Sequence, residues 1–174
     1  DFWGQHDYTM AGAQRGATFN ELVARYGTVD SAEKFTSLAQ FVNYDGHRAM
    51  FESQNIYRQG LLIWMSHACW PSMTWQCYDY YFEPTAAYFA CKKACELLHI
   101  QYNASTSRPE VVNLGIGDRR KLKAEVCAYD INGGLLKRTV EKVDALNDAT
   151  LDLNAVDTDG IALLRMRLIE NKNV

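Results

Sequence analysis

The sequence has few of the patterns that mark disulfide-rich, metal-binding or membrane-spanning proteins. Its five cysteines are an odd set without a C-x-x-C pair, and its four histidines lack the H-x-x-x-H and H-E-x-x-H spacings of metal ligands. No apolar run approaches the roughly 20 residues that cross a bilayer, and no signal-like segment opens the chain. We therefore expect no disulfide framework, no metal site, no cofactor and no membrane partner.

The sequence also lacks a strong excess of charge of either sign. Its formal net charge is -3, and the basic run at residues 119–123 is flanked by Asp118 and Glu125. A protein that binds nucleic acid usually carries a concentrated basic patch on one face. We expect no nucleic-acid partner, and we interpret the basic run as a solvated strand face.

What the chain does contain is divided unevenly along its length. All of its aromatic residues except Tyr102 and Tyr129 lie before Ile100, whereas most of its lysines and arginines lie after it. Such a change in composition is typical of a domain boundary. It predicts two domains, which cover residues 1–99 and residues 100–174.

The first region combines helical patterns with one short apolar run. Its longest helical pattern has apolar residues at spacings of three and four, which predict one buried stripe. Leu61 to Met65 is an apolar run behind a glycine, as in a strand buried on both faces of a parallel sheet. Helix, strand, long loop and helix in this order predict the C-terminal part of a (β/α)8 barrel. The expected helices are Phe19 to Tyr26, Asp30 or Ser31 to about Arg58, and about Pro84 to Leu97.

The second region changes to short alternating segments separated by turn signals. Asn132-Gly133-Gly134 predicts a hairpin turn, because glycine accepts positive φ, and Asp157 to Gly160 predicts another. The spacing predicts an immunoglobulin-like β-sandwich, but an incomplete one, since seven strands are usual. The fold class expected for the chain is thus α/β followed by all-β. The expected strands are Val111 to Ile116, Leu122 to Tyr129, Leu135 to Val140, Ala149 to Leu153 and Ile161 to Ile169.

The loop that follows Leu61 to Met65 is crowded with aromatic residues. Trp64 closes the apolar run, and further tryptophans and tyrosines follow as far as Tyr81. Aromatic faces match the apolar faces of a pyranose ring, and Ser66, His67 and Gln76 offer groups that bond hydroxyls. The loop therefore suits a sugar, with an aromatic corner of an ordinary core as the alternative.

Three stretches of the chain resemble one family of enzymes. They are N-Y-D-G-H-R-A-M-F-E (Asn43 to Glu52), G-L-L-I-W-M-S-H-A-C-W-P-S-M-T-W-Q-C-Y-D-Y-Y (Gly60 to Tyr81) and P-T-A-A-Y-F-A-C-K-K-A-C-E-L-L-H-I-Q-Y (Pro84 to Tyr102). In this order they resemble glycoside hydrolase family 2, in particular its exo-β-glucosaminidase and β-mannosidase branch. The likeness runs from about Trp3 to Tyr102.

The resemblance implies a (β/α)8 catalytic barrel, with Leu61 to Met65 as its last strand, followed by an immunoglobulin-like domain. In that family two glutamates, an acid/base and a nucleophile, hydrolyse a β-glycosidic bond with retention. Neither has a match here, because the candidate glutamates fall in expected helices and not at strand ends: Glu21, Glu33, Glu52, Glu83 and Glu96. We expect both catalytic glutamates to lie upstream of Asp1.

The resemblance also implies a set of substrate contacts. Trp64 matches the tryptophan at the end of the last strand, which forms a wall of the sugar subsite in that family. Trp70 matches the tryptophan before the loop proline, and Trp75 matches as well. Members of that family usually have asparagine two to three residues after the strand tryptophan, where this chain has His67. A hydroxyl contact made by His67 would therefore depend on pH. The alternative for His67 is a loop residue bonded to backbone, and Asp79 is expected to be a bonded structural anchor.

Together these patterns predict part of a retaining β-glycosidase that acts on β-mannoside or β-glucosaminide linkages, with carbohydrate as its partner. The resemblance favours a periplasmic or extracellular location. We expect the 174-residue chain alone to be inactive, and to self-associate or require the missing N-terminal part, because its buried strand has no neighbours. Two alternatives remain open: a non-catalytic carbohydrate-binding module that uses Trp64, Trp70 and Trp75, and a purely structural piece.

Overall fold

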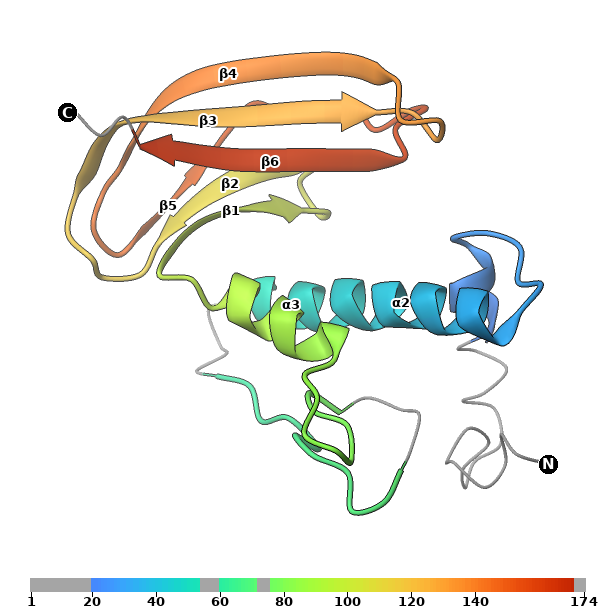
Figure 1. Ribbon diagram of the computed structural model, residues 1–174. Coiled ribbons are helices and arrows are strands. Elements are labelled where there is room, and N and C mark those ends of the chain that lie inside the picture. The colour runs from blue at the N-terminus through green and yellow to red at the C-terminus, as the bar shows by residue number, and fades with distance from the viewer. Residues whose placement is uncertain (1–19, 54–59, 72–75, 171–174) are drawn as a thin grey trace. The chain divides into compact units, whose positions relative to one another are not determined.

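The computed structural model describes residues 20–53, 60–71 and 76–170. The chain divides into two compact units, Asp1–Cys95 and Glu96–Val174. In the described residues, the first unit is helical and the second is built from strands (Figure 1). No helix among them combines the length and the apolarity that a bilayer crossing requires.

The main element of the first unit is helix α2, Ala32–Glu52. Ser31 begins it, because its side-chain oxygen accepts a hydrogen bond of 3.1 Å from the Lys34 backbone N–H. The helix ends at Ser53, whose extended backbone still donates to the Ala49 carbonyl at 2.9 Å. The expected start of the helix is confirmed. The expected continuation to Arg58 is wrong, because the helix ends before Ser53. Residues 54–59 lie outside the described ones.

Helix α3, Ala86–Ala94, packs against α2 through small side chains. Ala87, Ala90 and Ala94 are buried, and small residues let two helix backbones approach closely. The first N–H of α3 donates to the Gln40 side chain of α2 at 2.8 Å, which satisfies a donor that a helix start leaves without a partner. The expected inner face is wrong for Phe89 and Leu97, since both are about half exposed.

The expected strand Leu61 to Met65 is not formed. The segment is irregular, and Leu62 is 98% exposed. A strand buried on both faces needs hydrogen-bonded neighbours on either side. No other strand of the first unit occurs among the described residues, so this apolar run has nothing to pair with.

The second unit contains two three-stranded antiparallel sheets (Figure 1). Side chains from both sheets meet in one apolar cluster that includes Ile100, Val111, Leu122 and Val143. The order in one sheet is β1-β2-β5 and in the other β4-β3-β6. The bounds are β1 Leu98–Asn103, β2 Arg108–Asn113, β3 Arg119–Tyr129, β4 Leu135–Ala145, β5 Ala149–Asp152 and β6 Leu163–Glu170.

Five of these strands coincide with expected ones, although their ends are shifted. β1 was not expected, and the boundary placed between residues 99 and 100 falls inside it. The turn at residues 132–134 is confirmed: Asp130 Oδ1 accepts from the backbone N–H groups of Asn132 and Gly134, both at 2.8 Å. The segment Asp157 to Gly160 is a turn but not a hairpin, because β5 and β6 belong to different sheets.

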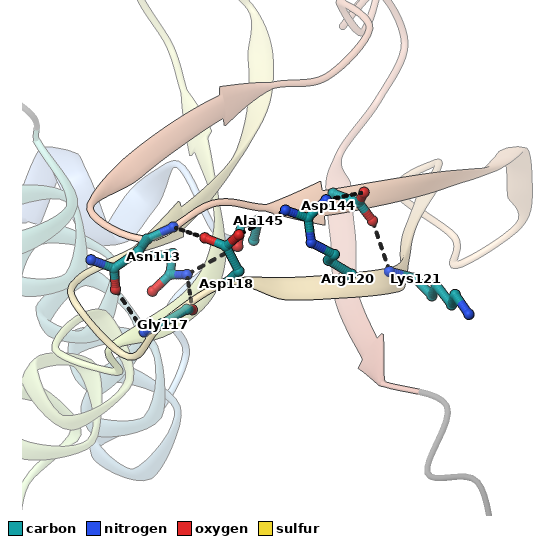
Figure 2. Close-up of polar contacts among 8 residues, drawn as sticks. Asn113, Gly117, Asp118, Arg120, Lys121, Asp144 and Ala145 are labelled. Carbon is teal, nitrogen blue, oxygen red and sulfur yellow. Dashed lines mark hydrogen bonds and ion pairs between the residues drawn. The ribbon is translucent and has the colours of Figure 1, made fainter.

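A polar network ties the loop between β2 and β3 to the turn between β4 and β5 (Figure 2). Asp118 accepts from the Asn147 backbone N–H at 3.0 Å and from Arg120 at 2.8 Å. The Asn113 side chain, fully buried, donates to the carbonyls of Gly117 and Ala145. Because these contacts join loops from both sheets, they fix how the two sheets of the second unit meet at this end.

Candidate functional site

The candidate site lies in residues 60–71 and 76–83, which are irregular and which hydrogen bonds hold in place. The Tyr78 N–H donates to the Ser66 carbonyl at 2.9 Å, which joins the two ends of the loop. Beside it, the Thr85 hydroxyl donates to the Gln76 carbonyl at 2.7 Å. Ala68, in the same segment, is buried. The loop is thus anchored at its base, next to the start of α3.

Asp79 organises the tight turn that follows. Its Oδ1 accepts from the backbone N–H groups of Tyr81 and Glu83 at 2.8 and 2.9 Å. The expected role of Asp79 as a bonded structural anchor is confirmed. Within this turn Phe82 has φ +67°, a left-handed conformation that a residue with a Cβ adopts at a cost of about 1 to 2 kcal/mol.

His67 lies flat on the ring of Phe82. The two ring centroids are 4.2 Å apart with an interplanar angle of 16°, so the rings are stacked. The Nε2 atom of the His67 ring is buried, and it has no hydrogen-bond partner among the residues that the structure describes. A buried polar atom left in this state costs about 1 to 3 kcal/mol, which a hydroxyl placed beside it would recover.

The matched tryptophans differ in what the structure says of them. Trp64 is 83% exposed and Trp70 is 54% exposed, and the Trp64–Met65 peptide bond is cis. Trp75 lies outside the described residues. Tyr81 and Phe82 are also largely exposed, so the segment presents several aromatic faces to solvent. Exposed aromatic surface of this extent is typical of a binding site or a covered interface.

Sequence reasoning missed Phe82, the residue against which His67 stacks. Its signal was the Tyr80-Tyr81-Phe82 run directly after Asp79, which continues the aromatic series of the loop. A positive φ at a phenylalanine cannot be read from residue type, because such residues avoid it. Strain of this kind occurs most often where a loop serves a function.

The candidate glutamates of the first unit lie in helices or at the end of this loop. Glu21, Glu33 and Glu52 are helical, and Glu52 is ion-paired with Arg48. Glu83 precedes α3, and its backbone closes the Asp79 turn. Among the residues that the structure describes, no three His, Cys, Asp or Glu side chains are grouped so as to hold a metal ion.

Two carboxylates in the second unit are buried, and sequence reasoning missed both. Glu110 on β2 accepts from Gln101 at 3.0 Å and from Asn103 at 2.6 Å, both on β1. Glu125 on β3 is surrounded by three arginines, and hydrogen bonds from Arg138 hold the pKa of its carboxyl below the usual 4.5. In the basic run beside it, Arg119, Arg120 and Lys121 are exposed as expected of a solvated strand face, and Lys123 is half-buried.

Comparison with known proteins gives consistent relatives. No model of a known protein family matches the chain. It is 34% identical over 119 residues to an exo-β-D-glucosaminidase of Amycolatopsis orientalis, which covers 64% of the chain and 12% of that enzyme. It is 30% identical over 135 residues to the mannosylglycoprotein endo-β-mannosidase of Lilium longiflorum, covering 75% of the chain and 14% of that enzyme.

A solved structure agrees with these relatives in fold. The exo-chitosanase of Amycolatopsis orientalis, a variant in complex with PNP-β-D-glucosamine, superposes with a TM-score of 0.74 at 23% identity. The match covers 94% of this chain and 23% of that one. The chain thus spans less than a quarter of the length of each of these proteins. Over that part of their length, it is a distant homologue of the exo-β-glucosaminidases and β-mannosidases of glycoside hydrolase family 2.

Proposed function

We propose that the chain is part of a retaining β-glycosidase that hydrolyses β-mannoside or β-glucosaminide linkages. In this proposal residues 1–99 are the C-terminal portion of a (β/α)8 catalytic barrel, and residues 100–174 are an immunoglobulin-like β-sandwich. The acid/base and nucleophile glutamates lie outside residues 1–174. What supports the proposal is the homology with family 2 enzymes, together with the irregular, unpaired state of Leu61 to Met65.

The role of this chain in the proposal is to supply one wall of the sugar pocket. Trp64 and Trp70 provide exposed aromatic faces, on which the C–H groups of a pyranose pack. His67 is held by its stack on Phe82, and its buried Nε2 has no hydrogen-bond partner in the described part of the chain, so a sugar hydroxyl is the partner we assign to it. Trp75 is proposed as a further contact from the sequence match alone.

The wall binds sugar but does not cut it. Retention requires two carboxyl groups about 5 Å apart on either side of the anomeric carbon. In this proposal neither carboxyl group belongs to this chain, because the candidate glutamates of its described part lie in helices or beside them and not at a strand end. The 174-residue chain should therefore bind a β-linked disaccharide weakly and leave nitrophenyl β-mannoside and β-glucosaminide intact.

The test is a titration of the chain with a β-1,4-glucosamine disaccharide and a β-mannosyl disaccharide, followed by intrinsic fluorescence and calorimetry. Trp64→Ala and Trp70→Ala should abolish binding. Phe41→Ala removes a half-exposed aromatic ring from α2 and is the matched control, which should bind as the parent chain does. Equal binding by Trp64→Ala and the parent chain would remove the proposed wall.

The second candidate is a non-catalytic carbohydrate-binding module that uses the same three tryptophans. The exposure of Trp64 and Trp70 favours it as much as it favours the first candidate. The two differ in what they need. A binding module should bind sugar with micromolar affinity as a monomer, whereas a barrel part should bind tightly only when the remainder of the barrel is added.

A further inference from the structure

Two thiols of the first unit meet where the aromatic loop is anchored on α3. Cys77 is buried in the loop, and Cys91 is half-buried on the helix. Their side chains are in hydrogen-bonding contact, and burial, followed by the neighbouring Cys77 thiol, raises the pKa of Cys91 to about 12. Both cysteines are free thiols in this structure. The contact brings together two groups that oxidation can join.

Other contacts hold the loop along the same face of α3. The Thr85 N–H and hydroxyl donate to the Cys77 carbonyl at 2.9 and 3.1 Å, directly before the helix begins. One residue further along the loop, the ring centroids of Tyr78 and Tyr88 lie 5.2 Å apart. Tyr88 and Cys91 are three residues apart in a helix and therefore share one of its faces. The approach of the two thiols is thus supported on both sides by contacts that do not involve sulfur.

Cys95 is also near Cys91, but it is not placed to form a bond with it. The Cys95 N–H donates to the Cys91 carbonyl at 2.9 Å, so the last turn of α3 is closed. Residues four apart in a helix have Cβ atoms about 5 to 6 Å apart. A disulfide instead holds its two Cβ atoms about 3.5 to 4.5 Å apart. A bridge between Cys91 and Cys95 would therefore open the end of the helix, which leaves Cys77 as the partner of Cys91.

We propose that Cys77 and Cys91 form a disulfide that fixes the aromatic loop on α3. The bond closes a segment of about 15 residues, whose two ends the contacts around Thr85 and Tyr88 already hold together. Such a bond forms and persists in an oxidising compartment. The inference concerns how the loop is held and not what it binds, so it does not rest on the proposed function.

The oxidant is a low-molecular-weight disulfide, RSSR, such as oxidised glutathione. The thiolate of Cys91, the more accessible of the two, attacks RSSR to form a mixed disulfide and release one RSH after protonation. The thiolate of Cys77 then attacks the Cys91 sulfur and displaces the second RSH. The two thiols lose two electrons and two protons, which RSSR takes up. Because burial raises the pKa of Cys91, its thiolate is scarce in the folded chain, and we expect the bond to close during folding.

The experiment refolds the reduced 174-residue chain in a mixture of reduced and oxidised glutathione, blocks the remaining thiols with iodoacetamide and maps the peptides by mass spectrometry. Cleavage after lysine and arginine and before Asp79 separates a peptide that contains Cys69 and Cys77 from one that contains Cys91 alone. The two peptides should be recovered as one linked species, lighter than their sum by two hydrogen atoms. Cys69→Ser should keep the link, which assigns it to Cys77.

Thermal unfolding gives a second measurement. The oxidised parent chain should melt about 5 to 10 °C above its reduced form, because the bond restricts the unfolded chain. Cys91→Ser should lose both the link and this difference. Cys95→Ser removes the exposed thiol at the end of the same helix and is the matched control, which should keep both. Cys91 is only half-buried, so its variant decides the matter even if Cys77→Ser does not fold.

Four results overturn the proposal. The first is recovery of Cys77 and Cys91 as alkylated thiols at every ratio of the two glutathione forms. The second is a link from Cys91 to Cys69 or Cys95 in place of Cys77. The third is an equal yield of the Cys77–Cys91 link in concentrated guanidinium chloride, which would make it a product of random pairing. The fourth is an oxidised chain that carries the link and melts no higher than the reduced one.

Discussion

The two units differ in the size of the side chains that they bury. In the second unit Leu122, Val111, Val112 and Cys127 are fully buried, whereas in the described part of the first unit Val23 is the large apolar residue in that state. The remaining buried apolar residues of the first unit are alanines and Cys77. The second unit therefore closes a core of its own, whereas the described part of the first unit buries mostly small side chains.

This difference teaches what the first unit requires. The stripe of α2 formed by Phe35, Leu38 and Val42 is only half buried, and Leu62 is almost fully exposed. Apolar surface contributes about 25 cal/mol for each Å² removed from water. The half-buried stripe of α2 therefore gains only part of the stabilisation that full burial would give. A sheet laid against α2 and beside Leu61 to Met65 would recover it, in agreement with the proposed barrel.

The largest expected effect comes from comparing a buried leucine of the second unit with an exposed leucine of the first. Leu122→Ala should lower the free energy of unfolding by about 2 to 5 kcal/mol, because it leaves a cavity in a closed core. Leu62→Ala makes the same chemical change at an exposed position and should cost less than about 0.5 kcal/mol. Urea unfolding followed by circular dichroism measures both. Equal costs would mean that Leu62 is covered in solution.

The second prediction concerns acid stability. The pKa of Glu125 is lowered in the folded chain, first by hydrogen bonds from Arg138 and then by the charges of the three arginines, so its carboxylate stabilises the fold above pH 4.5. That contribution is lost as the pH falls through the lowered pKa. Urea unfolding at pH 6 and pH 3 should show a smaller loss of stability in Glu125→Gln than in the parent chain. Glu141→Gln is the control and should keep the parent's pH dependence.

The smallest expected effect concerns the strained backbone at Phe82, in the aromatic loop of the first unit. Glycine accepts the φ of +67° at position 82 without strain, so Phe82→Gly should be more stable than Phe82→Ala by up to about 1 kcal/mol. The same pair at position 89, inside α3, should show the opposite order, because glycine costs a helix about 1 kcal/mol. Thermal unfolding of the four variants decides the matter. The same order at both positions would contradict the strained turn.

The sequence predicted those elements whose stability is local. β3 was visible because polar and apolar residues alternate, and the turn at residues 132–134 because Gly133 takes positive φ, here +80°. β1 also alternates, in Leu98-His99-Ile100-Gln101-Tyr102-Asn103, but it follows a helix directly and was assigned to the boundary. Its polar face is buried because His99, Gln101 and Glu110 bond one another.

What could not be predicted depends on partners distant in the sequence. The run Leu61 to Met65 has the composition of a buried strand, but composition does not supply the strands beside it. The burial of Glu125 could not be predicted, because the arginines that surround it come from β4 and β6, distant in the sequence. For the candidate site, the resemblance proposes Trp64 and Trp70, and His67 as a departure from the family pattern, while the stack of His67 on Phe82 required coordinates.

The way the strands are paired also sets the order in which the second unit can assemble. The pairs β1 with β2 and β3 with β4 join neighbours in the sequence, whereas Asn113 must find Ala149 and Tyr129 must find Leu163 across long intervening segments. Closing a long loop costs chain entropy before its contacts form, which slows folding. We therefore expect the two hairpins to appear first and β5 and β6 to join last, so that β6 completes a sheet whose other two strands are already paired.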